Sequence, residues 1–490
     1  MKIDNRDLMP KWVPDSEVIL ENDMPDWIKG LIMAEIHLRT FTKEKTLAAA
    51  IEKLDHFVEM GVNCLWITPV NDRGIEGNGY GNLGPGTIDP RLTGVIGYDE
   101  PWRKTDYDEG WKIFKNFVDE AHNRNIRIYL DIVTWGLEYD SELIEQKPEW
   151  FVPGIRGLCS AKSRMFNWTN RELREWFTSH VVDVALKTGI DGIRFDMEPM
   201  YASYLVIKEI RRRIRNTGKK ISLISEAPNE RLETFDFEQF GIADRRTKCN
   251  VNQRLFVAND IVDSYNNGCV PNNIVDCIKA GYGIGYPHLQ WAHKGGMFRY
   301  YTSQLSCHDY PQYNVCGSRM FAGYQGIFGP FIPLWMAGEE WDNPKTHPSL
   351  IYHNPLDWDA LEKEPHKTFF EDFKKMLRIR RTYTDIFTNF AEQNRESNIC
   401  AVETEGPENL QSYARYSENR AILVIPNRVA DEKEATFTVH VPFEEMGLNK
   451  EIYTVTDLWT DKVLMTGTRD EVENFKATVP FDSLGIYLVD

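Results

Sequence analysis

Three acidic residues in the middle of this chain each stand at the end of a strand-like run. Asp196 ends the run GIRFD, Glu226 ends ISLISE, and Asp309 follows His308 at the end of YTSQLSCHD. Side chains alternate along a strand, so Arg194 points the same way as Asp196, and a fixed cation there can hold a carboxylate ionised and aimed. Acids at the carboxyl ends of parallel strands meet at the active face of a barrel. Two carboxyl groups that flank one bond are what glycoside hydrolysis requires.

Alternating strand and helix signals predict the barrel that would position these acids. Amphipathic helices are expected at 46–60, 107–123, 171–188, 204–217 and 366–381. Buried strands are expected at 30–37, 61–70 and 126–134, in runs that end at 196, 226 and near 309, in a weaker unit near 236–255, and at 326–334. About eight strand–helix units in this order predict an α/β fold with a (β/α)8 TIM barrel.

Two stretches depart from this alternation. Residues 135–170 form a small excursion after the third strand, and the pattern changes from about residue 396 onward. Short alternating runs separated by polar turns are then expected to be strands, at 411–416, 420–426, 435–441, 451–458, 476–479 and 485–489. The predicted domains are a catalytic barrel over 1–395 with a short insertion at 135–170, and a C-terminal antiparallel β-sandwich over 396–490.

Composition and charge exclude some partners. The net charge of −17 argues against nucleic acid or an anionic membrane, because both need a basic face. The eight cysteines show no CxxC or other metal-binding spacing. Neither a signal peptide nor a run of transmembrane length is visible, so a cytoplasmic protein is expected, although a chain trimmed of its leader would look the same. The oligomeric state is left open.

The acids and their flanking residues resemble the α-amylase family, glycoside hydrolase family 13, over nearly the whole chain. The family's four short blocks have counterparts in order at Asp131–Gly136 (DIVTWG), at Asp191–Asp196, at Glu226 and at His308-Asp309, with supporting matches at Tyr80 and at Gly338–Glu340.

The resemblance implies a catalytic role for each of the three acids. Asp196 would be the nucleophile that forms a covalent glycosyl-enzyme. Glu226 would protonate the departing oxygen and then activate water, so that configuration is retained, with carboxyl groups about 5–5.5 Å apart. Asp309 would bind sugar hydroxyls, with His308 assisting. Each acid alone could equally cap a helix or pair with an arginine, but the three together favour catalysis.

Further binding residues follow from the same resemblance. Tyr80 would stack beneath the sugar, and Arg194, His308 and Trp135 are expected to contact or orient the substrate. Asp131 is expected to support the site structurally by pairing with Arg194.

The chain also departs from the family pattern. The first block ordinarily ends in Asn-His, where the Asn often ligates calcium, but here it ends in Trp135-Gly136. Because Trp135 offers no oxygen ligand, we expect no metal and no cofactor. We hypothesise that Gly136 leaves space for a substituted sugar or that Trp135 is a platform for it. After the nucleophile, Pro199 and Met200 stand where many amylases have Lys-His.

These patterns predict a retaining glycoside hydrolase that cleaves α-glucosidic bonds in α-linked gluco-oligosaccharides. Two alternatives are a transglycosidase of glucosyl-transfer or branching type, which shares the covalent intermediate, and a non-catalytic sugar- or protein-binding relative. The last is disfavoured because all three acids are in place. Linkage, chain length, and endo or exo action are not predicted.

Overall fold

The computed structural model describes residues 25–75, 79–156, 163–196, 203–225, 256–257, 275, 301–304, 308, 320, 322–329, 332–344, 355–388, 398–407, 409–427 and 433–490. The chain divides into two compact units. The first comprises Met1–Ile28, Met33–Val257 and Thr346–Leu356, and the second comprises Lys29–Ile32, Ala258–Lys345 and Asp357–Asp490. Within the described ranges, no helix is both long enough and apolar enough to cross a lipid bilayer.

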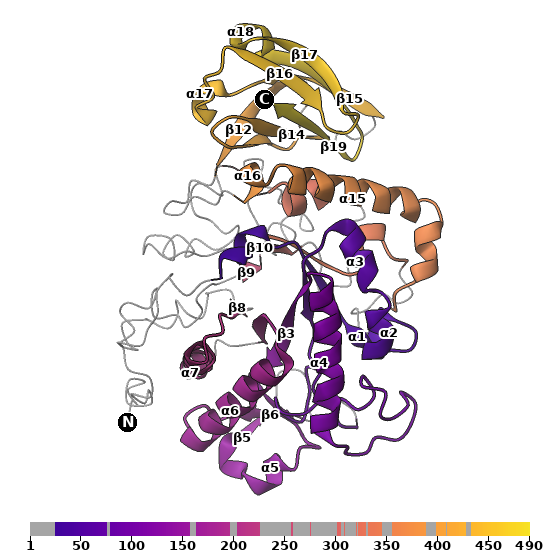
Figure 1. The fold of residues 1–490 in the computed structure, drawn as a ribbon, viewed down its shortest axis with the longest axis vertical. Helices are drawn as coiled ribbons and strands as arrows, with labels where there is room; N and C mark the ends of the chain where they lie inside the picture. The colour runs from indigo at the N-terminus through magenta and orange to yellow at the C-terminus, as the bar shows by residue number, and fades with distance from the viewer. Residues whose placement is uncertain are drawn as a thin grey trace. The chain divides into compact units, whose positions relative to one another are not determined.

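Parallel strands form the centre of the first unit (Figure 1). They pair in the order β8-β7-β3-β2-β1, and each neighbouring pair is parallel. Their bounds are β1 Met33–Ile36, β2 Cys64–Ile67, β3 Arg127–Val133, β7 Gly192–Asp196 and β8 Ser222–Ser225, and the unit also contains β9 Phe256–Val257. β1, β2 and β7 are buried throughout, as expected of a parallel sheet covered on both faces.

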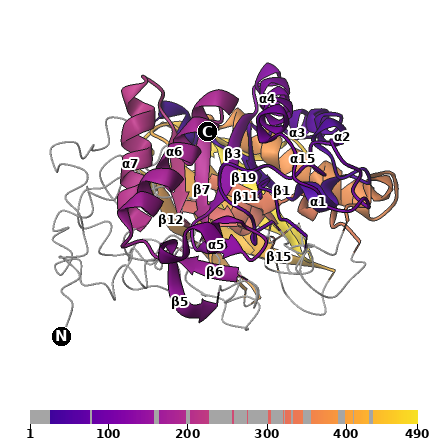
Figure 2. The ribbon, with the colours of Figure 1, turned by 90° about the horizontal axis from the view of Figure 1, so that it is seen from below.

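Helices connect these strands in the first unit. Their bounds are α1 Leu38–Phe41, α2 Leu47–Ile51, α3 Leu54–Met60, α4 Tyr107–Asn123, α6 Arg171–Thr188 and α7 Ser203–Asn216. The Asn170 side chain caps α6 by accepting from the Leu173 amide at 3.0 Å, and Gly189 ends it in the left-handed conformation. α6 and α7 lie side by side (Figure 2). The single helix predicted at 46–60 is wrong in one respect, because a turn at residues 52–53 divides it into α2 and α3.

The predicted excursion after the third strand contains a small antiparallel sheet. Its strand order is β4-β6-β5, and β4 Gly136–Glu138, β5 Phe151–Arg156 and β6 Ser163–Phe166 are accompanied by α5 Leu143–Gln146 and the 3-10 helix η4 Pro148–Trp150. The Phe166 ring centroid lies 5.1 Å from that of Trp168 and 5.9 Å from that of Phe177, which belongs to α6. Phe166 and Trp168 are therefore buried packing residues of the insertion.

The first two described strands of the second unit are a parallel pair, β10 Tyr301–Gln304 and β11 Ile332–Met336. The strand predicted at 326–334 starts later than expected, at Ile332. The preceding segment Ala322–Ile327 is a π-helix, labelled η5, in which the Phe328 amide bonds to the Gly323 carbonyl at 2.9 Å. A short buried apolar run has the same composition in a helix and in a strand, so periodicity could not distinguish the two. The sixth strand predicted near 236–255 lies outside the described residues.

Helices of the second unit precede its large antiparallel sheet. Their bounds are η6 Glu339–Trp341, η8 Trp358–Glu362, α15 His366–Thr382 and α16 Thr384–Phe387, while the 3-10 helix η3 Asp26–Gly30 crosses from the first unit into the second. α15 matches the helix predicted at 366–381 to within one residue.

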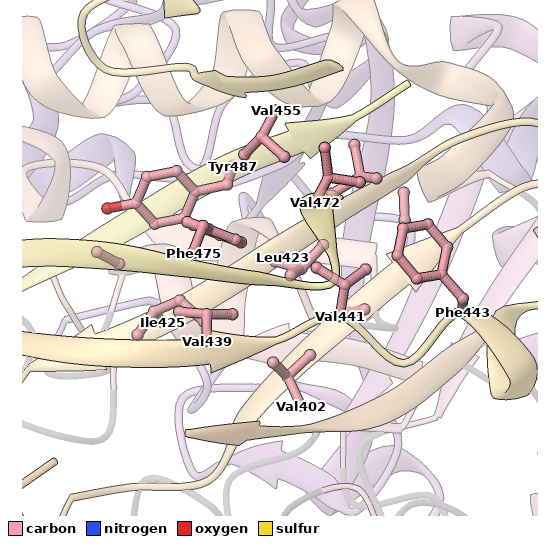
Figure 3. Packing of buried hydrophobic residues seen from close by; sticks show 14 of the residues in the cluster. Val402, Leu423, Ile425, Val439, Val441, Phe443, Val455, Val472, Phe475 and Tyr487 are labelled. Atoms are coloured by element: carbon pink, nitrogen blue, oxygen red, sulfur yellow. The ribbon is translucent and has the colours of Figure 1, made fainter. Parts of the chain in front are cut away.

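The C-terminal sheet has eight strands in the order β17-β16-β19-β14-β13-β12-β15-β18. The strands are β12 Ile399–Glu405, β13 Ser412–Tyr416, β14 Ala421–Asn427, β15 Glu434–His440, β16 Ile452–Asp457, β17 Lys462–Thr468, β18 Asn474–Pro480 and β19 Ser483–Val489, with the short helices α17 Phe443–Met446 and α18 Arg469–Val472. Apolar side chains from several of these strands, among them Leu423, Val439 and Val455, pack in one core (Figure 3). β12 and β17 were not predicted, and no residue of β17 is buried, so it lacks the alternation that marks a half-buried strand.

Together these elements are the (β/α)8 TIM barrel with an insertion after its third strand and a C-terminal antiparallel β-sandwich that the sequence predicts. The domain bounds 1–395 and 396–490 stay a prediction.

Candidate active site

Asp196 and Arg194 lie at the carboxyl end of β7. Arg194 Nη1 donates to Asp196 Oδ1 over 2.8 Å, and the two residues are only 3% and 4% exposed. They share one face because side chains two positions apart in a strand point the same way. A cation at this distance, shielded from water, favours the charged carboxylate.

Asp131 on β3 is the centre of a buried hydrogen-bond network. Arg194 Nη1 donates to its Oδ1 and Oδ2 at 3.1 and 3.0 Å. The Trp66 indole donates to Oδ2 at 3.2 Å, and the Tyr80 hydroxyl donates to the same oxygen at 2.8 Å. Asp131 is completely buried. Its carboxylate is therefore engaged by protein donors, as expected for a supporting residue.

The guanidinium of Arg194 also contacts two aromatic rings. It lies 4.9 Å from the Trp66 ring centroid and 6.0 Å from that of Tyr80. Both rings present a negative face to the cation, so they hold it in addition to the carboxylates. Trp66 was not among the predicted site residues, although its place on β2, beside β3, made a contact with Asp131 possible.

Tyr80 is held at the site by its hydroxyl and by its neighbours. Its ring packs with Val133 and Trp135 in one small apolar cluster. The preceding Gly79 has a φ of +106°, and a Cβ there would come within 2.6 Å of Arg39 Nη1. Only glycine suits both the conformation and this close approach.

A second buried ion pair supports the loop that carries Tyr80. Arg39 Nη1 donates to the Pro69 carbonyl at 2.8 Å, and Arg39 Nη2 lies 2.9 Å from Asp89 Oδ2. Neither Arg39 nor Asp89 was among the predicted site residues. An arginine three residues beyond the end of β1 gave no local signal, because its partner is fifty positions away.

Trp135 is almost fully buried at 1% exposure, beside Tyr80. Its backbone carbonyl accepts from Phe166 at 2.9 Å. Among the described residues, its indole Nε1 has no hydrogen-bond partner. A buried donor without a partner is uncommon and costs free energy, so this N–H is a candidate contact for a bound ligand.

The hypothesis that Gly136 leaves space for a substituted sugar is wrong. A Cβ built on Gly136 would lie 1.9 Å from the Arg164 carbonyl oxygen and 3.0 Å from Met165 Cα. The missing side chain is therefore directed at the backbone of β6, which pairs with β4 in the insertion. Glycine is required there for close strand approach rather than for an open subsite.

This geometry predicts that Gly136→Ala destabilises the protein. We expect the free energy of unfolding to fall by about 1–3 kcal/mol, because the methyl group overpacks two backbones that cannot separate without breaking the pairing. Gly30→Ala is the matched control, since nothing lies within 4 Å of its added Cβ. Denaturant unfolding of both variants measures the difference, and equal stabilities would contradict the assignment.

Several residues named from the sequence lie outside the described residues, namely Glu226, Asp309, Pro199 and Met200. β8 ends at Ser225, so the last described position of that strand directly precedes Glu226. His308 is described and buried, and it belongs to the second unit.

The described residues contain no group of three His, Cys, Asp or Glu side chains that could hold a metal ion. At the position of the family's calcium ligand, Trp135 supplies only an indole N–H, which does not suit a hard cation that prefers oxygen. The expectation that no metal or cofactor is used stays a prediction.

Comparison with known proteins adds to this geometry. Residues 408–488 match the α-galactosidase C-terminal β-sandwich domain family. The chain is 22% identical over 429 residues to the malto-oligosyltrehalose trehalohydrolase of Arthrobacter ramosus, covering 72% of this chain and 71% of the relative. Several other curated relatives, including isoamylases and oligo-1,6-glucosidases, are matched over 36% of their length or less.

Solved structures have the same fold. A noncanonic maltogenic α-amylase from Thermotoga neapolitana aligns with a TM-score of 0.69 at 18% identity, covering 94% of this chain and 99% of that one. The isomaltulose synthase of Erwinia rhapontici NX5 aligns with a TM-score of 0.67 at 14% identity, covering 96% of this chain and 100% of that one. The relatives are thus glycosidases and transglycosidases. With its barrel and its C-terminal sandwich, this chain has the fold of solved α-amylase structures, and its sequence is similar to that of a malto-oligosyltrehalose trehalohydrolase.

Proposed function

We propose that this protein is a retaining glycoside hydrolase that cleaves α-glucosidic bonds in α-linked gluco-oligosaccharides. The observation that supports the proposal is the different set of donors that holds each of two buried carboxylates. Asp131 is engaged by Trp66, Tyr80 and Arg194, whereas Asp196 is held by the cation at the strand end where substrates meet a barrel.

Asp196 is the proposed nucleophile. Its attack on the anomeric carbon would expel the leaving group, while Glu226 donates a proton to the departing oxygen. Arg194 keeps Asp196 ionised before attack and fixes its direction. Glu226 would then take a proton from water, which releases the sugar with its configuration retained. Asp309, with His308, is proposed to bind hydroxyls of the sugar.

Two aromatic residues are proposed to form part of the sugar subsite. Tyr80 offers an apolar ring surface in a position fixed by its hydroxyl bond to Asp131. Trp135 offers an indole N–H that no described residue accepts, which a sugar hydroxyl would satisfy. No metal or cofactor is needed for these steps.

A transglycosidase is the second candidate, because the covalent intermediate can be intercepted by a sugar hydroxyl instead of water. The structural match to an isomaltulose synthase favours keeping this alternative. Longer or relinked products at high substrate concentration would identify transfer.

A panel of α-linked di- and oligosaccharides tests the proposed reaction. We expect hydrolysis of at least one α-glucosidic linkage. Chromatography of the products detects it. Proton NMR of the first product should show the α-anomer before mutarotation, because two inversions at the anomeric carbon give retention. Initial release of the β-anomer would contradict the retaining mechanism, and no turnover of any member would contradict the proposed substrate class.

A further inference from the structure

The first unit contains a pocket of about 320 Å³ that shares no residue with the candidate active site. Four separate segments line it: the loop around residues 83–87, the segment 102–107 that leads into α4, residues 140–146 of the insertion, and α6. Its volume lies within the range of about 300–1,000 Å³ that is usual for small-molecule sites.

Two glycines in the pocket lining allow backbone to approach aromatic side chains. A Cβ on Gly84 would lie 3.3 Å from Trp176, and one on Gly86 would lie 2.3 Å from His180 Cδ2. Trp176 and His180 are half-buried neighbours on α6 with ring centroids 5.1 Å apart. Their rings are tilted by 50° to each other and remain partly open to solvent.

His180 can also accept a hydrogen bond. Its Nδ1 lies 2.8 Å from the Trp176 carbonyl oxygen, which can only accept. In the neutral ring the proton is therefore on Nδ1, and Nε2 carries a lone pair. A ligand hydroxyl could donate to this nitrogen.

Two further aromatic residues of the lining, Trp102 and Tyr107, are fixed by a buried carboxylate. The Trp102 indole donates to Asp72 Oδ1 at 2.9 Å, and the Tyr107 hydroxyl donates to Asp72 Oδ2 at 2.8 Å. Burial raises the pKa of Asp72, and these hydrogen bonds partly offset the effect. The two rings are therefore preorganised, which reduces the entropy lost when a ligand binds.

Charged groups of both signs border the pocket. Lys104 Nζ lies 3.2 Å from Glu142 Oε1, and Asp140 and Gln146 also contribute to the lining. A phosphate would meet two carboxylates there, whereas a neutral ligand with many hydroxyls could use donors and acceptors alike. Aromatic faces combined with such a polar border suit the apolar face and the hydroxyl edge of a pyranose ring.

We propose that this pocket binds a glucose unit of a gluco-oligosaccharide chain, separately from the catalytic subsite. The choice of ligand rests on the proposed function, whereas the existence of a second site rests on the pocket's own residues.

Isothermal titration of maltoheptaose tests the second site. In the Asp196→Asn protein, which should not turn the sugar over, we expect two binding events per chain. In Asp196→Asn/His180→Ala, the affinity of one event should fall at least about tenfold, equivalent to about 1.4 kcal/mol. Asp196→Asn/Gln146→Ala is a milder second change to the same pocket, kept in case the loss of His180 disturbs folding.

Tyr139→Ala, added to Asp196→Asn, is the matched control. Tyr139 is an exposed aromatic residue of the same insertion, 42% exposed, and it does not line the pocket. It should leave both events intact. A single event in Asp196→Asn, or two events that neither pocket variant alters, would overturn the proposal. One event weakened by the pocket variants would also overturn it, because the pocket would then be part of the catalytic cleft.

The outcomes are distinguishable from failure of the proposed function. That function is judged by hydrolysis of the substrate panel with the wild type, which does not depend on the titration. Turnover by the wild type with a single binding event in Asp196→Asn would contradict only the second site. Two binding events without turnover would contradict only the proposed reaction.

Discussion

Asp196→Asn is expected to lower kcat by at least about 10⁴-fold, because the amide cannot attack an anomeric carbon. The substitution keeps the shape of the side chain and removes the negative charge that Arg194 holds at 2.8 Å. Arg194 retains Asp131 as a partner, so the protein should stay folded. Initial rates on the best substrate of the panel, with thermal unfolding in parallel, measure the two effects.

Asp191→Asn is the matched control for this experiment. Asp191 immediately precedes β7 at the strand end opposite Asp196, where its Oδ2 accepts from the Ile128 amide at 2.9 Å and contacts His122 Nε2 at 2.8 Å. It is a structural carboxylate, so we expect kcat to stay within about twofold of wild type. If both variants lost activity equally, the loss would reflect general damage and Asp196 would not be the nucleophile. Unchanged activity in Asp196→Asn would refute the mechanism directly.

Arg194→Met is expected to reduce the free energy of unfolding by about 3–5 kcal/mol, because it leaves two buried carboxylates without their shared cation. Methionine keeps much of the apolar stem, so the change is dominated by charge rather than by volume. Asp131 and Asp196 are 0% and 4% exposed, and water cannot easily replace the lost donor. Urea unfolding measures the stability, and activity should fall as well because Asp196 loses its orientation.

A double-mutant cycle isolates the Arg194–Asp131 interaction. Asp131→Asn removes one of the two charges that Arg194→Met leaves unpaired, so the double variant should be more stable than the sum of the single effects by about 1–3 kcal/mol. Lys115→Met, which removes an exposed ion pair to Asp119, should change stability by less than about 0.5 kcal/mol. Strictly additive single effects would show that the two residues do not stabilise each other.

Helical periodicity predicted most of the long helices closely. The bounds predicted for α4 and α6 are those observed, since caps and amphipathic spacing are local properties of the chain. The errors occurred where local pattern carries little information. The strand predicted at 326–334 starts only at Ile332, because the π-helix Ala322–Ile327 includes its first two residues, and the exposed strand β17 has no buried face to reveal it.

In the candidate site, too, local spacing predicted the contacts within one strand but not the long-range contacts. Alternation along one strand was enough to predict that Arg194 and Asp196 lie together. It could not show that Trp66 and Tyr80 share Asp131 as an acceptor, because these contacts join residues 51 and 65 positions apart.

By itself the sequence determined most of the order of strands and helices, the family resemblance and the choice of candidate acids, because these depend on residue type and short spacing. Only the tertiary structure showed that Trp66, Tyr80 and Arg194 all donate to Asp131, since that depends on long-range contacts. It also overturned the role assigned to Gly136. The direction of a missing Cβ is set by the backbone and by the strand opposite, and neither can be inferred from the residue type alone.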